Sequence, residues 1–375
     1  MSQFDLIVVG GGINGLWSAL IAQQQGLKVA LYEKNDFGSG TSGRSTQLIH
    51  GGLRYLEHGE LKLVYESLHE RTWLLKNIPQ LVKPLLFYIP VFKSKPLLGI
   101  KYFMGLLLYY VLSGGRGTFP KWVSPQKLKK ENPNLETDFL LGALEYFDAQ
   151  TNDRALCHFL AEECTKQGVS IFKEHEVVSI QKDVNGYSVE VLDKTKQQVM
   201  TVASKVVLSA KGPWEDKKYL RPTKGVHLFF EKFTGEHGYL LSATDDRVFF
   251  VLPYEGKTLI GTTDTNYLGS PDEVKTEDAD RKYLIEQTGR YFKNIKNVKQ
   301  LGDYAGIRPL MNSGAATNAK ASRRDFLIES ENGYYHMIGG KLTTGRAFAT
   351  RTVKKILSSH FKNIKFQQMH WRMAE

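Results

Sequence analysis

Three glycines near the start of the chain form the first feature that could do chemistry. They end at Gly12 after an apolar, β-branched run over residues 4–9, and Gly15 follows where a helical pattern begins. In a turn from strand to helix, Gly10 permits a sharp bend, Gly12 lets phosphate groups approach the backbone, and Gly15 lets the helix pack closely on the strand. The helix would then present N–H groups and a partial positive charge to a pyrophosphate.

An acidic residue follows at the distance that ribose binding requires. A second apolar run over 28–32 ends at Glu33, about 20 residues after the glycines, where a carboxylate can accept a hydrogen bond from a ribose 2′-hydroxyl. The glycine spacing is weak evidence by itself, because the chain contains 34 glycines and a flavodoxin-like turn without a ligand is the alternative. Strand, turn, helix, strand and carboxylate together predict a site for an adenine dinucleotide.

The segment over 38–46 bears on which dinucleotide the site would take. It is rich in glycine, serine and threonine and follows Glu33 closely, whereas a nicotinamide-binding half would continue into further strand–helix units. Its hydroxyls and backbone N–H groups suit the far side of a pyrophosphate. This order of segments is therefore unlike that of a nicotinamide-binding domain.

Residues 47–57, which read Gln-Leu-Ile-His-Gly-Gly-Leu-Arg-Tyr-Leu-Glu, closely resemble the FAD-dependent glycerol-3-phosphate dehydrogenase family, part of the D-amino-acid-oxidase-like flavoproteins. Further matching motifs follow in the family's order over nearly all 375 residues. They lie at 147–148, 152–154, 212–214, 225–227, 260–264, 306–310, 324–325 and 339–344. Several motifs in one order are far more specific than any one of them.

The resemblance implies a non-covalently bound FAD and oxidation of sn-glycerol 3-phosphate, or a close phosphorylated polyol, to the ketone glycerone phosphate. Electrons would pass to a quinone. The residues expected to bind the cofactor are Gly10, Gly12, Ile13, Asn14, Gly15, Glu33, Lys34, Gly40, Thr41, Ser42, Arg44, Ser45, Leu48, Ile49, His50, Gly51, Val177, Gly212, Trp214, Gly306, Arg308, Gly340, Lys341, Leu342 and Thr343.

A phosphorylated substrate needs cations. Guanidinium groups make planar, bidentate contacts with phosphate or carboxylate, and Arg54 and Arg308 both lie in matched motifs. The resemblance implies that these two arginines, Tyr55, Lys341 and Thr344 approach the substrate. Any single arginine can instead form an ordinary salt bridge, so the assignment depends on the joint match.

Oxidation of a secondary alcohol also requires removal of the hydroxyl proton, and histidine is the usual base near neutral pH. Of ten histidines, His227 and His50 lie in the matched motifs, and we place His227 ahead of His50. Two alternatives stay open. Both histidines can be structural, and Arg308 can lower the pKa of the alcohol without a dedicated base.

Two features depart from the family. Its members usually continue into a C-terminal helical domain, whereas this chain stops at Glu375, as a short form or a truncated one. In addition, Lys211 replaces a small hydroxyl residue, and Gly345 stands where a bulkier residue is common. The alternatives are therefore an FAD-dependent oxidoreductase of a 2-hydroxy acid or an amino acid, with Arg308 binding carboxylate, and a flavin-binding module without catalysis.

The composition is that of a globular protein, with 42% hydrophobic and 24% charged residues. The two cysteines, Cys157 and Cys164, lie on one face of an expected helix, which indicates a reducing compartment, and no metal site is expected. The first strand begins almost at once, so no secretory signal is expected, and we expect a cytoplasmic protein, peripheral on the cytoplasmic face of the inner membrane if it binds lipid.

The net charge of +11 is compatible with a solvated basic surface or with anionic lipid. No basic stripe or nucleic-acid-binding module is present, so nucleic acid is not expected as a partner. Residues 102–112 are uncharged and apolar, but a span of a bilayer needs about 20 such residues. This segment is therefore expected to be either a buried helix or an interfacial helix with basic flanks.

The expected fold is α/β (α+β overall), with two domains. A discontinuous Rossmann-like FAD-binding domain would comprise residues 1–85, 145–220 and 301–375, and an antiparallel-sheet substrate domain would comprise 86–144 and 221–300. Apolar periodicity predicts helices over 60–77, 153–167 and about 342–360. Strands are predicted over 169–172, 177–180, 187–191, 206–208, 226–230, 239–241, 248–252 and 258–260.

Overall fold

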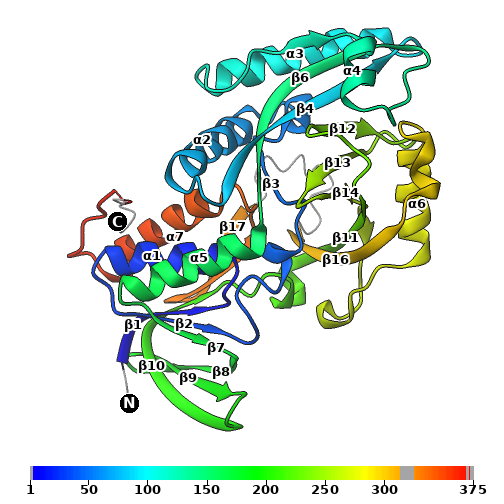
Figure 1. Cartoon of the computed structure of the whole chain (residues 1–375). Coiled ribbons are helices and arrows are strands. Elements are labelled where there is room, and N and C mark those ends of the chain that lie inside the picture. Colours follow the sequence, from blue (N-terminus) through cyan, green and yellow to red (C-terminus); the bar gives the residue numbers. More distant parts are fainter. Residues whose placement is uncertain (1–2, 313–324, 369–370, 372–375) are drawn as a thin grey trace. The chain divides into compact units, whose positions relative to one another are not determined.

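A parallel sheet in the order β18-β10-β1-β2-β7 brings together strands from distant parts of the chain. The computed structural model describes residues 3–312, 325–368 and 371 (Figure 1). The strands are β1 (Gln3–Val9), β2 (Val29–Glu33), β7 (Ser170–Lys173), β10 (Gln198–Ser209) and β18 (Tyr334–Gly339), with β17 (Asp325–Glu331) antiparallel at the edge. They belong to a unit formed by residues 1–45, 152–222 and 308–375.

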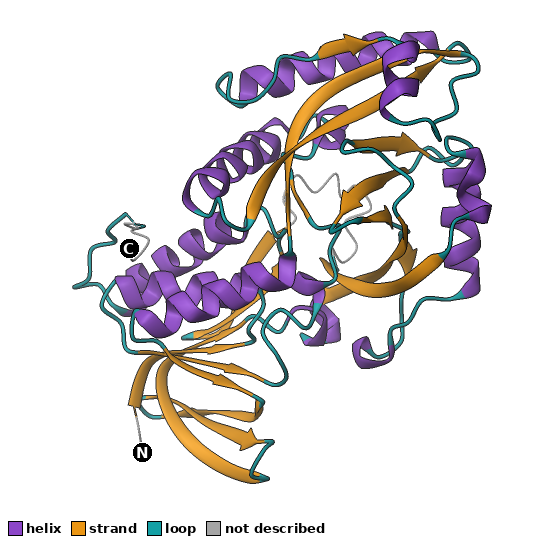
Figure 2. Cartoon of the chain, viewed as in Figure 1, coloured by secondary structure: helices purple, strands orange, loops and turns teal. Residues whose placement is uncertain are grey.

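Both faces of this sheet are covered, which is why its central strands read as continuous apolar runs. Helix α1 (Ile13–Gln24) packs against α5 (Asp153–Lys166) and α7 (Gly345–His360) on one face (Figure 2). On the other face, the antiparallel strands β8 (His175–Asp183) and β9 (Gly186–Asp193) continue the sheet beyond β10 and fold over it. Tyr187 and Val189 there share a core with Ile7 and Tyr32.

The second unit comprises residues 46–151 and 223–307 and is built on another sheet. Its strand order is β15-β11-β14-β13-β12-β4-β6-β3, with β16 on β11 and β5 on β6. Apart from the pair of β16 with β11, the pairs are antiparallel except β12 with β4, where Gly238 lies beside Phe87 in parallel register. The bounds are β3 (Leu48–Ile49), β4 (Val82–Phe92), β5 (Lys121–Val123), β6 (Leu140–Thr151), β11 (Leu220–Glu231), β12 (Gly238–Ser242), β13 (Val248–Tyr254), β14 (Lys257–Gly261), β15 (Thr265–Asn266) and β16 (Gln300–Met311).

Four helices accompany this second sheet in the described residues: α2 (Leu61–Asn77), α3 (Pro96–Leu112), α4 (Pro125–Glu131) and α6 (Asp278–Gly289). Helix α3 begins at Pro96, before the apolar run that starts at residue 102. Proline is tolerated in the first turn of a helix, because the backbone N–H there has no partner within the helix. Within the described part of the chain, no helix is both long and apolar enough to cross a bilayer.

The unit boundaries differ from the expected domain boundaries. Residues 46–85, expected in the FAD-binding domain, lie in the second unit, because β4 and β3 both pair with β6. Residues 145–151 and 301–307 belong to the second unit as well, since they are parts of β6 and β16.

Most predicted elements are confirmed, with small shifts. Helix α7 begins at Gly345 rather than near 342, because residues 341–344 form a turn. Helix α6 was not predicted, and residues 221–300 read instead as strands. The reason is that its described buried positions include one apolar side chain, Leu284, alongside Asp280, Gln287 and Thr288, so its periodicity is weak.

Candidate functional site

In the glycine turn between β1 and α1, packing alone requires glycine at Gly10 and Gly15. Gly10 has φ +110°, and a Cβ there would lie 2.6 Å from the Ala210 carbonyl oxygen. A Cβ on Gly15 would lie 2.0 Å from the Gly10 carbonyl oxygen, so α1 approaches the strand as the sequence predicts. Gly12 is different, because its Cβ would meet only the Ser42 side chain, at 3.1 Å from Oγ. The fold leaves space beside Gly12, as a phosphate-binding turn requires.

The first turn of α1 gathers two other segments around it. The Ile13 N–H donates to Ser42 Oγ at 3.0 Å, and the Asn14 side chain donates to the Gly339 carbonyl oxygen at 3.1 Å. Gly340 has φ +88°, where a side chain would be strained, and a Cβ there would lie 3.0 Å from Asn14 Nδ2. Asn14 Oδ1 is buried and has no hydrogen-bond partner among the described residues, so it remains an acceptor at the positive end of the helix.

Glu33 lies at the end of β2, as predicted, and it also holds the glycine turn. Its Oε2 accepts from the Gly11 N–H at 2.7 Å and its Oε1 from the Asn35 N–H at 2.8 Å. Burial raises the pKa of Glu33 against these backbone hydrogen bonds, which lower it. Because each carboxylate oxygen has two lone pairs, the side chain retains capacity for a ribose hydroxyl.

An aromatic side chain closes the loop that follows Glu33. A Cβ on Gly40 would lie 2.8 Å from the Trp214 ring, and the Lys34 ammonium lies 4.1 Å from the centre of the same indole. Gly212, with φ +60°, sits beside Thr41. The predicted residues of the 33–42 and 212–214 segments are therefore neighbours in space.

Glu215 and His336 fix the ends of two of these segments, and sequence reasoning missed both. His336 on β18 approaches Glu215 through Nδ1 at 3.1 Å and Ser330 through Nε2 at 2.8 Å. Burial raises the pKa of Glu215, but hydrogen bonds from His336 and Ser209 outweigh it and lower the pKa overall. This pair joins the turn at 212–214 to the strand that leads to Gly340.

The other predicted residues of the first unit vary in their surroundings. Arg44 is exposed, while Ser45 donates through its N–H and Oγ to Asp153 Oδ2. Val177 on β8 packs against the core cluster that contains Tyr32. Lys341 and Leu342 are half-buried in the turn before α7, Thr343 and Thr344 are buried there, and Arg308 is half-buried on β16. Arg324 of the 324–325 motif lies outside the described residues.

His227 lies in the second unit, on β11, and is 2% exposed. Its Nε2 is 3.0 Å from Thr46 Oγ1, and its ring stacks on Tyr304 with ring centres 4.8 Å apart. Gly261 on the adjacent strand lies against the ring as well. These contacts hold the imidazole in one orientation.

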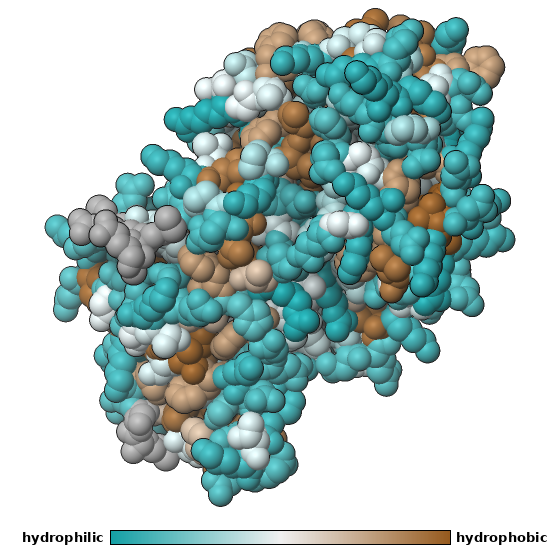
Figure 3. Space-filling model, viewed as in Figure 1, coloured by the Kyte–Doolittle hydropathy of each residue, from teal (hydrophilic) through white to brown (hydrophobic). Residues whose placement is uncertain are grey.

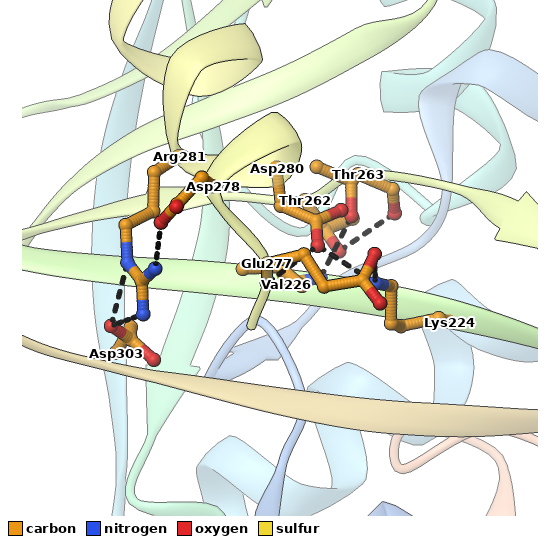
Figure 4. A network of polar contacts seen from close by, with 9 residues as sticks. All are labelled: Lys224, Val226, Thr262, Thr263, Glu277, Asp278, Asp280, Arg281 and Asp303. Carbon is orange, nitrogen blue, oxygen red and sulfur yellow. Dashed lines mark hydrogen bonds and ion pairs between the residues drawn. The ribbon is translucent and has the colours of Figure 1, made fainter. Parts of the chain in front are cut away.

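A polar network anchors the strand that carries His227 (Figure 4). Lys224, buried on β11, bonds to Glu277 at 2.9 Å and Asp280 at 2.8 Å, at the N-terminus of α6. The Val226 N–H donates to Thr263 Oγ1 at 3.0 Å, one residue before His227. These bonds fix the backbone on the N-terminal side of the histidine.

The remaining predicted residues of the second unit lie on or near β3, the 3₁₀ helix η2 (Leu53–His58) and β16. Leu48 and Ile49 are buried in β3, and His50 is half-buried with its ring edge-on to Phe250. Arg54 is exposed on η2, Tyr55 is half-buried there, and Gly306 is buried on β16. In the described residues, no group of His, Cys, Asp and Glu could hold a metal ion.

The donors and acceptors around α1 fit an adenine dinucleotide. The space at Gly12, the buried acceptor of Asn14, the hydroxyls of Ser42 and Thr41 and the carboxylate of Glu33 lie at the carboxyl ends of β1 and β2. Nucleotides bind at this edge of open α/β sheets.

Comparison with known proteins agrees with this reading. Residues 5–353 match the model of the family described as FAD dependent oxidoreductase. The chain is 35% identical over 372 residues to the aerobic glycerol-3-phosphate dehydrogenase of Staphylococcus epidermidis, covering 94% of this chain and 66% of that protein. It is 35% identical over 371 residues to the D-erythritol 1-phosphate dehydrogenase of Brucella abortus, covering 94% and 73%.

A solved structure agrees as well. The glycerol-3-phosphate dehydrogenase from Bacillus halodurans, complexed with FAD, superimposes with a TM-score of 0.77 at 28% identity, over 97% of this chain and 66% of that one. The chain thus spans about two thirds of the length of this structure and of the staphylococcal relative. With a family match across most of its length, the chain belongs to the FAD dependent oxidoreductase family.

Proposed function

We propose that this chain binds FAD non-covalently and oxidises sn-glycerol 3-phosphate, or a close phosphorylated polyol, to the corresponding ketone. The observation that carries the proposal is the arrangement around α1, where Gly12 leaves space and Asn14 Oδ1 is a buried acceptor. The names of the relatives support the substrate class, because both act on polyol phosphates.

FAD supplies the hydride acceptor, and the chain supplies position and charge. The first turn of α1 and Ser42 would hold the pyrophosphate, and Glu33 the ribose. The turn before α7, with Lys341, would stabilise negative charge on the reduced ring system. Cys157 and Cys164 are buried in α5, and burial raises the pKa of both thiols, which supports non-covalent binding.

Arg308 and Arg54 are the proposed phosphate ligands of the substrate. Arg308 precedes Pro309, which restricts its backbone to extended conformations and so fixes the base of its side chain. Tyr55, Lys341 and Thr344 complete the proposed substrate-binding set. A 2-hydroxy acid or an amino acid, bound by Arg308 through its carboxylate, is the competing substrate class.

His227 is the proposed base, because its ring is oriented by Thr46 and Tyr304. In the tautomer in which Nε2–H donates to Thr46 Oγ1, the substrate hydroxyl proton would move to Nδ1. His50, half-buried near the start of the same unit, is the second candidate.

The proposed electron acceptor is a quinone, taken up where the protein meets an anionic membrane surface on the cytoplasmic side. A cavity of about 460 Å³ lies between η2 and α3, lined mainly by apolar side chains such as Leu53, Leu56 and Val248. Arg54 and the ion pair of Lys101 with Glu57 (3.1 Å) supply its charged groups. Its volume lies within the range of small-molecule sites.

Helix α3 also presents an apolar stripe to solvent. Leu97, Ile100, Met104, Leu108 and Val111 are exposed at helical spacing, while Gly99, Leu106 and Tyr109 on the opposite side are buried. Figure 3 shows apolar side chains gathered over this helix at the upper edge of the view. Exposed Lys93 and Lys95 precede the helix, and exposed Lys101 lies within it. An interfacial helix next to an anionic lipid surface has this composition.

Anaerobic reduction of the flavin tests the proposal. Purified holoprotein is mixed with glycerol 3-phosphate, erythritol phosphate, a 2-hydroxy acid or an amino acid without oxygen, and the visible flavin band is followed. Bleaching by a polyol phosphate supports the proposed function, and bleaching by the acids alone supports the competing substrate class. Bound FAD that no compound reduces would identify a non-catalytic flavin module.

A further inference from the structure

A fully buried polar cluster in the second unit ends on the backbone of Gly51. Arg71 on α2, Asp148 on β6 and Tyr109 on α3 are each at least 96% buried. Arg71 Nη1 donates to Asp148 Oδ1 at 2.6 Å, and the Tyr109 hydroxyl donates to the same carboxylate at 2.8 Å. The Gly51 N–H in turn donates to the Tyr109 oxygen at 2.8 Å.

The cluster is a weak source of folding stability, because burying its charged groups costs desolvation free energy. Two charges removed from water often contribute no more than well-packed apolar groups of the same volume would. The cluster instead orients the backbone around it, because Arg71 also donates to the carbonyl oxygens of Phe147 (2.9 Å) and Arg116 (3.2 Å). Its members therefore hold backbone groups of several segments at fixed positions.

Gly51 is also tightly packed, in addition to its hydrogen bond with Tyr109. A Cβ on this residue would lie 2.5 Å from the Tyr109 hydroxyl and 2.5 Å from Leu68 Cδ2. The hydroxyl remains a donor to Asp148 at ordinary pH, since burial and then the charge of Asp148 raise the pKa of Tyr109 well above its usual value. The same oxygen accepts from Gly51, so removal of this one atom breaks both bonds and leaves the Gly51 N–H with its longer hydrogen bond to Asp148 Oδ1, at 3.3 Å.

We propose that Tyr109, supported by Asp148 and Arg71, is a positioning residue that fixes the His50–Gly51 backbone against the flavin. This inference rests on the proposed function and on the expectation, implied by the family resemblance, that residues 48–51 contact FAD. Tyr109 is buried, and it would act through its hydrogen bond with Gly51. A misplacement of about 1 Å at a reacting centre can cost up to about 100-fold in rate, so the effect belongs in kcat rather than in substrate affinity.

The test compares holoenzyme Tyr109→Phe with Tyr110→Phe, the next residue of the same helix, whose ring packs edge-on against Phe119. At saturating FAD, we expect Tyr109→Phe to lower kcat about tenfold, leave KM within about twofold and change the visible circular dichroism of the flavin. Tyr110→Phe should match the wild type. If both variants keep the wild-type kcat and flavin spectrum, and Tyr109→Phe only melts earlier, the positioning role is excluded.

Two further variants test the inference if the Tyr109→Phe protein does not fold. Asp148→Asn keeps the shape of the side chain and weakens the Tyr109 bond, so a smaller fall in kcat with unchanged KM is expected, and an unchanged kcat would overturn the inference. Gly51→Ala should cost less in the Tyr109→Phe background than in the wild type, because the clashing hydroxyl is gone. A wild-type holoenzyme that does not oxidise polyol phosphates would overturn the proposed function and this inference together, whereas an active wild type with unaffected variants overturns only this inference.

Discussion

Gly261 lies directly under the imidazole of His227. The two residues are paired across β14 and β11, and a Cβ on Gly261 would come within 2.1 Å of His227 Cδ2. The glycine is therefore present because the histidine ring covers it, and any side chain there must displace the ring.

Gly261→Ala is consequently expected to impair catalysis while FAD stays bound. A displaced general base typically costs about 10²–10⁴-fold in rate. The measurement is kcat/KM with glycerol 3-phosphate alongside the flavin content of the purified protein. Gly302→Ala is the matched control, because its Cβ would meet nothing within 4 Å and its rate should stay at the wild-type value. Wild-type turnover in Gly261→Ala would remove His227 from the mechanism.

Gly12→Val should abolish FAD retention and leave the fold intact. Its Cβ would meet only the flexible Ser42 side chain in the protein itself, whereas a bound pyrophosphate would collide with the valine. We expect colourless protein whose far-ultraviolet circular dichroism and melting temperature equal those of the wild-type apoprotein. Yellow protein with an FAD spectrum would show that the turn does not hold the pyrophosphate.

Arg308→Ala should weaken turnover with flavin still bound. If this guanidinium makes two charge-assisted bonds to an anionic substrate, its loss costs roughly 2–5 kcal/mol of binding or transition-state stabilisation. Arg308→Lys should recover little, because lysine lacks the planar fork. Steady-state kinetics of both variants check this, and rates near wild type would remove Arg308 from the substrate site.

Glu215 is expected to make a pH-dependent contribution to the free energy of unfolding. Its pKa lies below its usual value in the folded protein, so its stabilisation is complete above the unfolded-state pKa of about 4.3 and is lost as pH falls below that value. Glu215→Gln, which keeps the shape, should cost about 1–3 kcal/mol at pH 7. Melting curves from pH 7 to 3 should show the difference from wild type narrowing in acid. A constant difference would mean that Glu215 is not ionised in the folded state.

The stripe on α3 should control lipid binding. Leu97→Glu combined with Ile100→Glu removes two exposed apolar side chains and adds negative charge, so flotation with anionic vesicles at low salt should fall at least tenfold. Val184→Glu, on another fully exposed apolar residue, is the control and should float as the wild type does. If the wild type itself does not float at low salt, the stripe serves another purpose.

The parts of the site that could be predicted are those in which chemistry and sequence are local. Gly10, Gly15 and Glu33 lie within one strand–turn–helix–strand unit, where backbone geometry requires the two glycines and the Gly11 N–H requires the Glu33 acceptor. The helices α2 and α5 were predicted almost to their ends for the same reason, since periodicity is a local signal.

The parts that could not be predicted depend on pairs distant in sequence. His336 and Glu215 contact each other although they are 121 residues apart in the sequence, and no local pattern near either residue indicates its partner. The pairing of β4 with β6, which moves residues 46–85 into the second unit, is likewise set by tertiary register. The sequence shows Gly261 only as part of a motif, and the structure explains the glycine by the His227 ring that packs on it.

The order of strands in the parallel sheet has a consequence for synthesis of the chain. Strand β1 leaves the ribosome well before its neighbour β10, which ends at Ser209, and before the next strand, β18, which ends at Gly339. At typical translation speeds of 5–20 residues per second, roughly 20–70 seconds separate β1 from the last of these strands. Until then, the nascent chain carries apolar strands with unpaired edges, so slowed translation between residues 209 and 334 should expose it to aggregation and chaperone binding.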